Sequence, residues 1–226
     1  MQSKVIFMKK AEAQSICGTL TQTSKMPCKS SSLPTEACQT GYAMAQIEGS
    51  ICNKCYANAG FYRMYEKTIK PAQWARFDAV QLAMNDAMQG DLWVSAMVAL
   101  IGNDAFFRHH DSGDLQGLAH LELIARVAQL TPNTRHWLPT REYGMVKQYI
   151  AKHGELPKNL IVRLSAMYPD QPVIVPKSLQ GIANVAVSNV HTDKPIGTAC
   201  NAPANNGACG DCRLCWTGET VSYALH

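Results

Sequence analysis

Nine cysteines, gathered at the two ends of the chain, constrain this sequence more than any other feature. The positions are Cys17, Cys28, Cys38, Cys52, Cys55, Cys200, Cys209, Cys212 and Cys215. Because nine is an odd number, the cysteines cannot all pair in disulfides within the chain. They also make up only about 4% of the 226 residues, below the roughly 8–10% typical of a disulfide scaffold. Clustered, reduced thiols of an intracellular protein favour metal binding or catalysis.

The remaining composition is that of an ordinary globular protein. It is 46% hydrophobic and 17% charged, enough for one substantial core. The longest apolar run, Leu92–Ile101, is shorter than the roughly 20 residues that cross a bilayer. The N-terminus lacks the apolar stretch and cleavage site of a signal peptide. We therefore expect a cytoplasmic protein with no membrane contact.

The cysteines divide the chain into three parts within one compact domain. Residues 1–70 are rich in turn formers and carry nine Lys and Arg against four Asp and Glu, which predicts a loop-rich, mildly basic segment. A loop of this length needs something to hold it, and a metal would do so. Residues 71–195 have the pattern of an α/β core. Residues 196–226 form a C-terminal cysteine segment.

The middle segment alternates short apolar runs with helical periodicity. Helices are predicted over residues 73–101, interrupted at Gly90 with Asp91 as a cap, and over 115–130 and 143–152. Strands are predicted at 105–109, 135–139, 160–164 and 185–188. This alternation favours a parallel sheet built from βαβ units. Four units are too few for a complete barrel, so the predicted fold class is a partial, open β/α barrel or a small parallel sheet with helices.

Polar residues follow each predicted strand, where parallel α/β folds bind ligands. We predict catalytic roles for His109, His110, Asp111 and Glu142, and substrate binding by Ser112, Arg141, Arg163 and Asn189. Arginine suits an anionic substrate, and a histidine or carboxylate can transfer protons. Structural alternatives stay open: Asp111, Ser112 and Asp114 as helix caps, Glu142 in a first helical turn, and one histidine in the core.

The C-terminal cysteines carry the strongest motif. Cys209, Cys212 and Cys215 are spaced C-x2-C-x2-C, with Cys200 upstream as a candidate fourth ligand. This spacing resembles the ferredoxin run and favours a [4Fe-4S] cluster, with zinc as the alternative.

The N-terminal cysteines form a looser set. Cys52 and Cys55 make a C-x2-C pair that Cys28 and Cys38 could complete, with iron–sulfur and zinc equally compatible. Cys52 and Cys55 could instead join the C-terminal set. Cys17 is expected to be a free thiol.

Several stretches of the chain resemble the bacteriophage gene-product-88-like family. They are residues 23–28 with Leu33-Pro34 and Cys38, residues 49–62, residues 107–115, residues 137–142 and residues 209–216. The resemblance implies a phage protein that works in the bacterial host's cytoplasm. It also implies that every cysteine except Cys17 belongs to the pattern, which would give two four-cysteine sites and one or two iron–sulfur clusters.

A second, fold-level resemblance is to radical S-adenosylmethionine enzymes, through Cys55-Tyr56-Ala57 and the partial barrel. Their C-x3-C-x2-C signature is absent from this sequence. Four cysteines per cluster would also leave no iron open for the methionine group, so this analogy rests on fold alone.

Two functions compete on this evidence. The first is an iron–sulfur protein with a redox or radical-type enzymatic role at the carboxyl ends of the strands, acting on an unidentified substrate. The second is a non-catalytic protein, held together by zinc or iron–sulfur, that binds nucleic acid or a host protein through its basic N-terminal segment and its aromatic residues. For Tyr56, Phe61 and Tyr62, packing around the metal site is the alternative interpretation.

Overall fold

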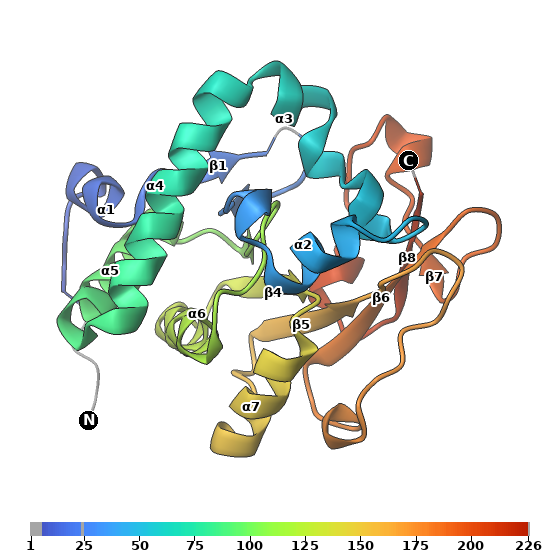
Figure 1. Cartoon of the computed structure of the whole chain (residues 1–226). Coiled ribbons are helices and arrows are strands. Elements are labelled where there is room, and N and C mark those ends of the chain that lie inside the picture. Colours follow the sequence, from blue (N-terminus) through green and yellow to red (C-terminus); the bar gives the residue numbers. More distant parts are fainter. Residues whose placement is uncertain (1–5, 24, 226) are drawn as a thin grey trace.

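The computed structural model describes residues 6–23 and 25–225 (Figure 1). The first five residues and Ser24 of the family motif lie outside this part. One open sheet of eight strands runs through the molecule in the order β1-β2-β3-β4-β5-β6-β8-β7. All neighbouring strands are parallel except β1 and β2. The strands are β1 (Thr21–Gln22), β2 (Lys29–Ser30), β3 (Phe106–Arg108), β4 (Arg135–Thr140), β5 (Leu160–Ser165), β6 (Val185–His191), β7 (Thr198–Ala199) and β8 (Val221–Ala224).

The four predicted strands are confirmed as β3 to β6, and they stand side by side in chain order. The predicted helices between them are α6 (Leu118–Leu130) and α7 (Tyr143–His153). Gly154 ends α7 with a positive φ of 79°, a conformation that glycine adopts without strain. The mixed α/β class with a mostly parallel sheet is therefore confirmed, as an open sheet.

The helical region before β3 differs from the prediction. It contains α4 (Glu66–Asn85) and α5 (Ala87–Ile101), and the break falls at Asp86. The carboxylate of Asp86 accepts from Gln89 N at 2.9 Å and caps α5. Gly90 lies inside α5, where an added Cβ would be 3.0 Å from the carbonyl oxygen of Ala83. The glycine therefore permits close packing of α4 on α5, which periodicity alone does not indicate.

The N-terminal segment holds more regular structure than its turn formers predict. It contains α1 (Lys10–Cys17), α2 (Gln39–Ala45), α3 (Gly60–Met64) and the short 3-10 helices η1 (Thr35–Ala37), η2 (Ile51–Lys54) and η3 (Tyr56–Asn58). The rest of the chain adds η4 (Lys177–Leu179), η5 (Pro203–Asn205) and η6 (Leu214–Trp216). No described helix is long and apolar enough to cross a membrane.

The two faces of the sheet have different coverings. Phe107, Leu138, Leu160, Val162 and Leu164 belong to one face and pack in the main hydrophobic core together with side chains of α6 and α7. On the other face, register places Arg108 beside Trp137 and Pro139 beside Arg163. The C-terminal segment covers that face, where Trp216 packs against Phe106 and Trp137.

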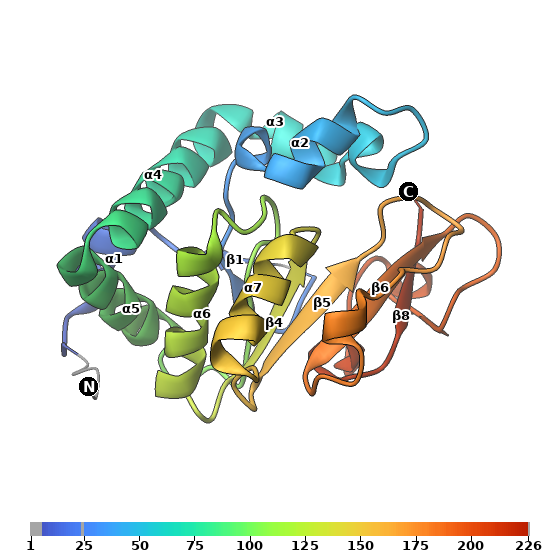
Figure 2. The same cartoon turned by 60° about the horizontal axis from the view of Figure 1, so that its bottom comes forward.

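The segment from Cys38 to the end of α3, which we call the cover, lies over the carboxyl ends of β3 and β4. Figure 2 shows α2 and α3 above the strands, with α6 and α7 in front of them. Hydrogen bonds join this cover to the sheet loops: Gln39 Nε2 donates to Gln116 O at 3.1 Å, and Ile51 N donates to Met167 O at 3.0 Å. The cover carries Cys38, Cys52 and Cys55, so these cysteines lie at the carboxyl edge of the sheet.

Candidate functional site

Asp114 joins the ends of β3 and β4 at the carboxyl edge. Its carboxylate accepts from Thr140 Oγ1 at 2.6 Å, Arg141 N at 2.8 Å and Leu115 N at 2.8 Å. Burial raises its pKa to about 6, against the lowering effect of these hydrogen bonds. Helix α6 begins only at Leu118 and has no side-chain cap. Asp114 therefore fixes the edge rather than capping that helix.

Glu142 fixes the cysteine-bearing cover to the same edge. One carboxylate oxygen accepts from Thr40 N at 2.7 Å and the other from Thr40 Oγ1 at 2.8 Å. Thr40 lies in the first turn of α2, where backbone N–H groups lack partners within the helix. The carboxylate thus stabilises the start of α2 and positions Cys38, which immediately precedes that helix.

We name Cys38, Cys52 and Cys55 the edge cysteines. Cys38 and Cys52 flank Gly41 of α2: a Cβ added there would lie 3.6 Å from one sulfur and 3.7 Å from the other. Burial is the main cause that raises the pKa of both thiols, and the three thiol groups influence one another electrostatically. The positive charge of Arg141 acts in the opposite direction on both.

Arg141 also offers free donors at this edge. Its Nε donates to Ala166 O at 3.0 Å, and no described residue accepts a hydrogen bond from its two terminal nitrogens. The side chain is half-buried. A guanidinium with free terminal nitrogens can bind a carboxylate or phosphate with two hydrogen bonds. The structure therefore places Arg141, for which we predict anion binding, near Cys38 and Cys52.

Five of the six remaining cysteines gather on the opposite face of the sheet from α6 and α7. We name Cys28, Cys200, Cys209, Cys212 and Cys215 the face cysteines. Cys28 packs with Trp137 and Trp216, and Cys215 packs against the same cluster. Electrostatic interactions connect Cys28 with Cys209, Cys209 with Cys200 and Cys212, and Cys215 with Cys200. Burial raises the pKa of Cys28 to about 12.

This arrangement differs from the four-plus-four division that the spacing and resemblance predict. Strand β2 lies between Cys28 and Cys38 in the chain. Because Ser30 of β2 pairs with Arg108, Cys28 faces the same side of the sheet as Arg108 and Trp137. The described chain therefore brings the cysteines together as three and five. Cys17 is buried in α1 and donates to Ala13 O at 3.3 Å, as a single thiol would.

No group of three described His, Cys, Asp and Glu side chains lies close enough together to hold a single metal ion. Tetrahedral zinc, with Zn–S bonds of about 2.3 Å, needs its sulfur atoms about 3.8 Å apart. Soft thiolates remain the donor type that iron–sulfur clusters and zinc prefer.

The two predicted histidines lie under the helices rather than at the cysteines. His109 Nε2 is 3.1 Å from His136 Nδ1, and His136 Nε2 is 2.8 Å from Thr131 Oγ1. His110 has a positive φ of 56°, and its ring lies 5.2 Å from that of His120. Its Nδ1 is buried without a hydrogen-bond partner among the described residues. Burial lowers the pKa of both His109 and His110 well below the usual value.

Asp111 lies in a polar network that the sequence did not indicate. Tyr62 donates to its carboxylate at 3.1 Å, and Tyr56 donates to its backbone carbonyl. Arg108 Nη2 donates to the Tyr56 hydroxyl at 3.1 Å, and its guanidinium lies 4.5 Å from the Trp137 ring centre. This network lies between the two cysteine groups, because Tyr56 follows Cys55 and Arg108 influences Cys28, Cys209 and Cys215. Alternation along β3 could have indicated Arg108, which faces away from Phe107.

Three predicted substrate-binding residues have their hydrogen-bonding groups engaged within the chain. Arg163 is fully buried and makes five hydrogen bonds to backbone carbonyls, four of them in residues 214–219. Ser112 bonds to Gln73 and Leu33, and Asn189 bonds to Val173 and Ile196. These side chains hold loops and strands together, and Arg163 holds residues 214–219, which include Cys215.

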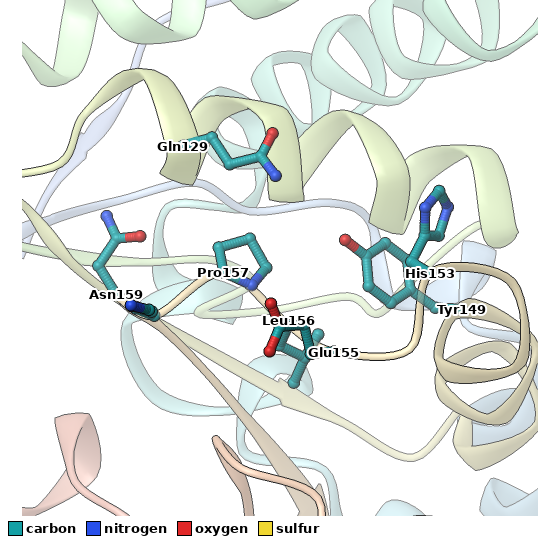
Figure 3. Close-up of a pocket in the computed structure, with 8 residues that line it drawn as sticks. Gln129, Tyr149, His153, Glu155, Leu156, Pro157 and Asn159 are labelled. Carbon is teal, nitrogen blue, oxygen red and sulfur yellow. The ribbon is translucent and has the colours of Figure 1, made fainter.

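Two hollows of comparable size lie in different places. One, of about 490 Å³, is lined by residues 53–60, including Cys55. The other, of about 420 Å³, lies at the amino ends of the strands, where residues 155–159 lead into β5 (Figure 3). Figure 3 shows Gln129 of α6 facing it, with Tyr149 and His153 of α7 beside each other. The first hollow is adjacent to the carboxyl edge, where α/β folds bind ligands.

A family model described as Gene product 88 matches residues 6–218. No curated protein matches the chain. No solved structure matches it either, so the likeness to radical S-adenosylmethionine enzymes has no support from a known structure.

Proposed function

The chain belongs to the Gene product 88 family, and from this premise we propose that it is an iron–sulfur protein with a redox-active site at the edge cysteines. The observation that carries the proposal is the position of Cys38 and Cys52 beside Arg141 at the carboxyl edge, with Cys55 near both thiols. The face cysteines take a structural role in this proposal. Two of them, Cys28 and Cys215, pack with the aromatic rings of Trp137 and Trp216.

The residues at the edge fit a cluster in donor type. Two of the three thiols, those of Cys38 and Cys52, lie beside Gly41, and a side chain there would occupy the region between the two sulfurs. Asp114 and Glu142 use their carboxylates to hold the surrounding backbone, so the donors offered to a cluster are sulfur atoms. When bound, such a cluster supplies one-electron transfer.

The presence of three edge cysteines, rather than four, favours a reaction over simple electron storage. The edge offers one thiolate fewer than a four-iron cluster has irons, so a group from outside the chain would complete the ligand set. Catalytic metal sites commonly keep such an open position. Arg141 would orient the anionic end of the incoming molecule through its terminal nitrogens, and the cover formed by α2 and η2 would limit access of water.

Metal and sulfide analysis of protein purified without oxygen tests this function. We expect a brown protein that contains iron and acid-labile sulfide in equal amounts. Cys52→Ser and Cys212→Ser should each lose part of the iron and retain the rest. A colourless protein with stoichiometric zinc, or with no metal, would overturn the proposal.

The role of Arg141 is tested on the loaded protein by electron paramagnetic resonance. Phosphate, acetate and S-adenosylmethionine are added separately, the last as the probe for a radical-type reaction. An added molecule that occupies the open position should shift the signal that Cys52→Ser removes, and Arg141→Gln should weaken that response. Unchanged spectra with all three probes would argue against anion binding at the edge.

A further inference from the structure

A surface of exposed aromatic and basic side chains lies next to the edge cysteines, and nothing in the proposed function uses it. We name it the α3 surface and define it by Lys54, Phe61, Arg63, Met64, Tyr65 and Lys67. Phe61 is 66% exposed, Met64 68% and Tyr65 54%. Exposed apolar side chains gathered in one place are typical of interaction sites.

Packing around a metal site does not account for these aromatic residues. Tyr56 and Tyr62 do direct their hydroxyl groups to Asp111, as that interpretation allows. Phe61 and Tyr65 instead stack on each other, with ring centres 6.2 Å apart and planes inclined by 12°. Two nearly parallel exposed rings offer flat faces to a ligand with flat groups of its own.

The charges on the surface are predominantly positive. Lys54, Arg63 and Lys67 are exposed and form no ion pair with any described residue. The one acidic residue of this stretch, Glu66, pairs with Lys70 at 2.8 Å. Lys54 lines the hollow of residues 53–60 together with Cys55. A partner for this surface therefore carries negative charge as well as flat apolar groups.

We propose that the α3 surface binds a single strand of nucleic acid. Bases of a single strand stack on exposed aromatic rings, and its phosphates pair with neighbouring cations. In a duplex the base faces are already stacked on each other, so Phe61 and Tyr65 would find no partner there. The proposal does not depend on the iron–sulfur function, because none of the six residues is a cysteine.

Binding is measured by fluorescence anisotropy with a labelled 20-nucleotide thymidylate strand, the matching uridylate strand and a 20-base-pair duplex. We expect both single strands to bind more tightly than the duplex. Three phosphate contacts predict that log K falls against log salt concentration with a slope of about −2. The double variant Phe61→Ala/Tyr65→Ala should weaken binding at least tenfold. Arg63→Glu/Lys67→Glu should weaken it and flatten the salt dependence.

Matched controls change the same chemistry elsewhere on the surface. Ile174→Ala removes a side chain that is 86% exposed, and Lys194→Glu reverses an exposed charge; both should bind as the wild type does. Ultraviolet cross-linking of a bromouridine strand to the wild-type protein should label residues 54–67, which decides the site even where a variant is unstable. No detectable binding, preference for the duplex, or cross-links only elsewhere would overturn the proposal.

Discussion

The edge cysteines and the face cysteines are both clustered thiols, yet their surroundings differ in kind. Cys38 and Cys52 lie near Arg141, Asp114 and Glu142, among the charged groups of the carboxyl edge. Of the face cysteines, Cys28 and Cys215 pack with tryptophan rings, and Cys215 lies in residues 214–219, whose carbonyl groups Arg163 binds. In the proposed function, thiols take part in a reaction at the edge and hold structure on the face.

The largest difference is expected when one cysteine of each group is removed. Cys212→Ser should lower the melting temperature by on the order of 10 °C, because a bound metal group contributes several kcal/mol to the folding of the segment it holds. Cys52→Ser should lower it by a few degrees at most. Thermal unfolding followed by circular dichroism on anaerobic protein measures both. Equal losses in the two variants would remove the distinction.

Arg163 and Arg141 should likewise differ in how much each contributes to the free energy of unfolding. Arg163→Met leaves buried carbonyl groups without donors and should cost about 3–5 kcal/mol of unfolding free energy. Arg141→Met removes one hydrogen bond to Ala166 from a half-buried site and should cost less than about 1 kcal/mol. Urea denaturation at neutral pH measures both values. A stable Arg163→Met variant would show that the segment around Cys215 is held by other means.

The strands show which features of the fold the sequence predicts and which it does not. The strands β3 to β6 follow from local runs of apolar residues, and the site edge follows from the polar residues after them. The grouping of Cys28 does not follow, because it depends on β2, a two-residue strand paired parallel to β3. Spacing along the chain cannot reveal which side of a distant strand a cysteine faces.

The candidate site residues show the same limit: local sequence patterns do not reveal contacts with distant segments. Arg141 directly follows β4, and Arg163 lies within β5. One is left with free donors and the other is buried under residues 214–219, since a segment far along the chain returns to cover it. Glu142 illustrates the converse: its partner Thr40 is 102 residues away.

A pH dependence is expected that affects both cysteine groups alike. Burial lowers the pKa of His136 to about 4 and that of His120 to about 3, against a usual value near 6.5. Below pH 6.5 these two histidines bind protons in the unfolded chain but stay neutral in the folded chain. The free energy of unfolding therefore falls as the pH decreases toward 4. Each of these histidines should cost on the order of 2 kcal/mol at pH 5, and Asp114, whose pKa is raised to about 6 by burial, offsets only part of that loss.

Urea denaturation of the wild type at pH 7 and pH 5 measures this loss. His136 contacts neither cysteine group, and the loss should therefore be the same in Cys52→Ser and in Cys212→Ser. Stability that is constant between the two pH values would contradict the buried, neutral state of these rings.

The smallest expected effect concerns two glycines in helices. In Gly41→Ala the new methyl group would lie 3.1 Å from Cys38 Cβ and between two sulfurs, and it should lower the iron bound at the edge. Gly144→Ala is the matched control in α7, where a Cβ meets nothing within 4 Å. It should keep all its iron and gain up to about 1 kcal/mol from helix propensity. Iron analysis and urea denaturation together give both numbers, and equal iron in the two variants would count against the edge site.

The division of the cysteines into three and five is tested most directly by comparing Cys28→Ser with Cys38→Ser. Both proteins are loaded with iron and sulfide without oxygen, reduced, and compared by electron paramagnetic resonance, with the signals assigned by Cys52→Ser and Cys212→Ser. The structure predicts that Cys38→Ser loses the edge signal and that Cys28→Ser retains it. Loss of the edge signal in Cys28→Ser would contradict the division and restore a four-cysteine N-terminal site.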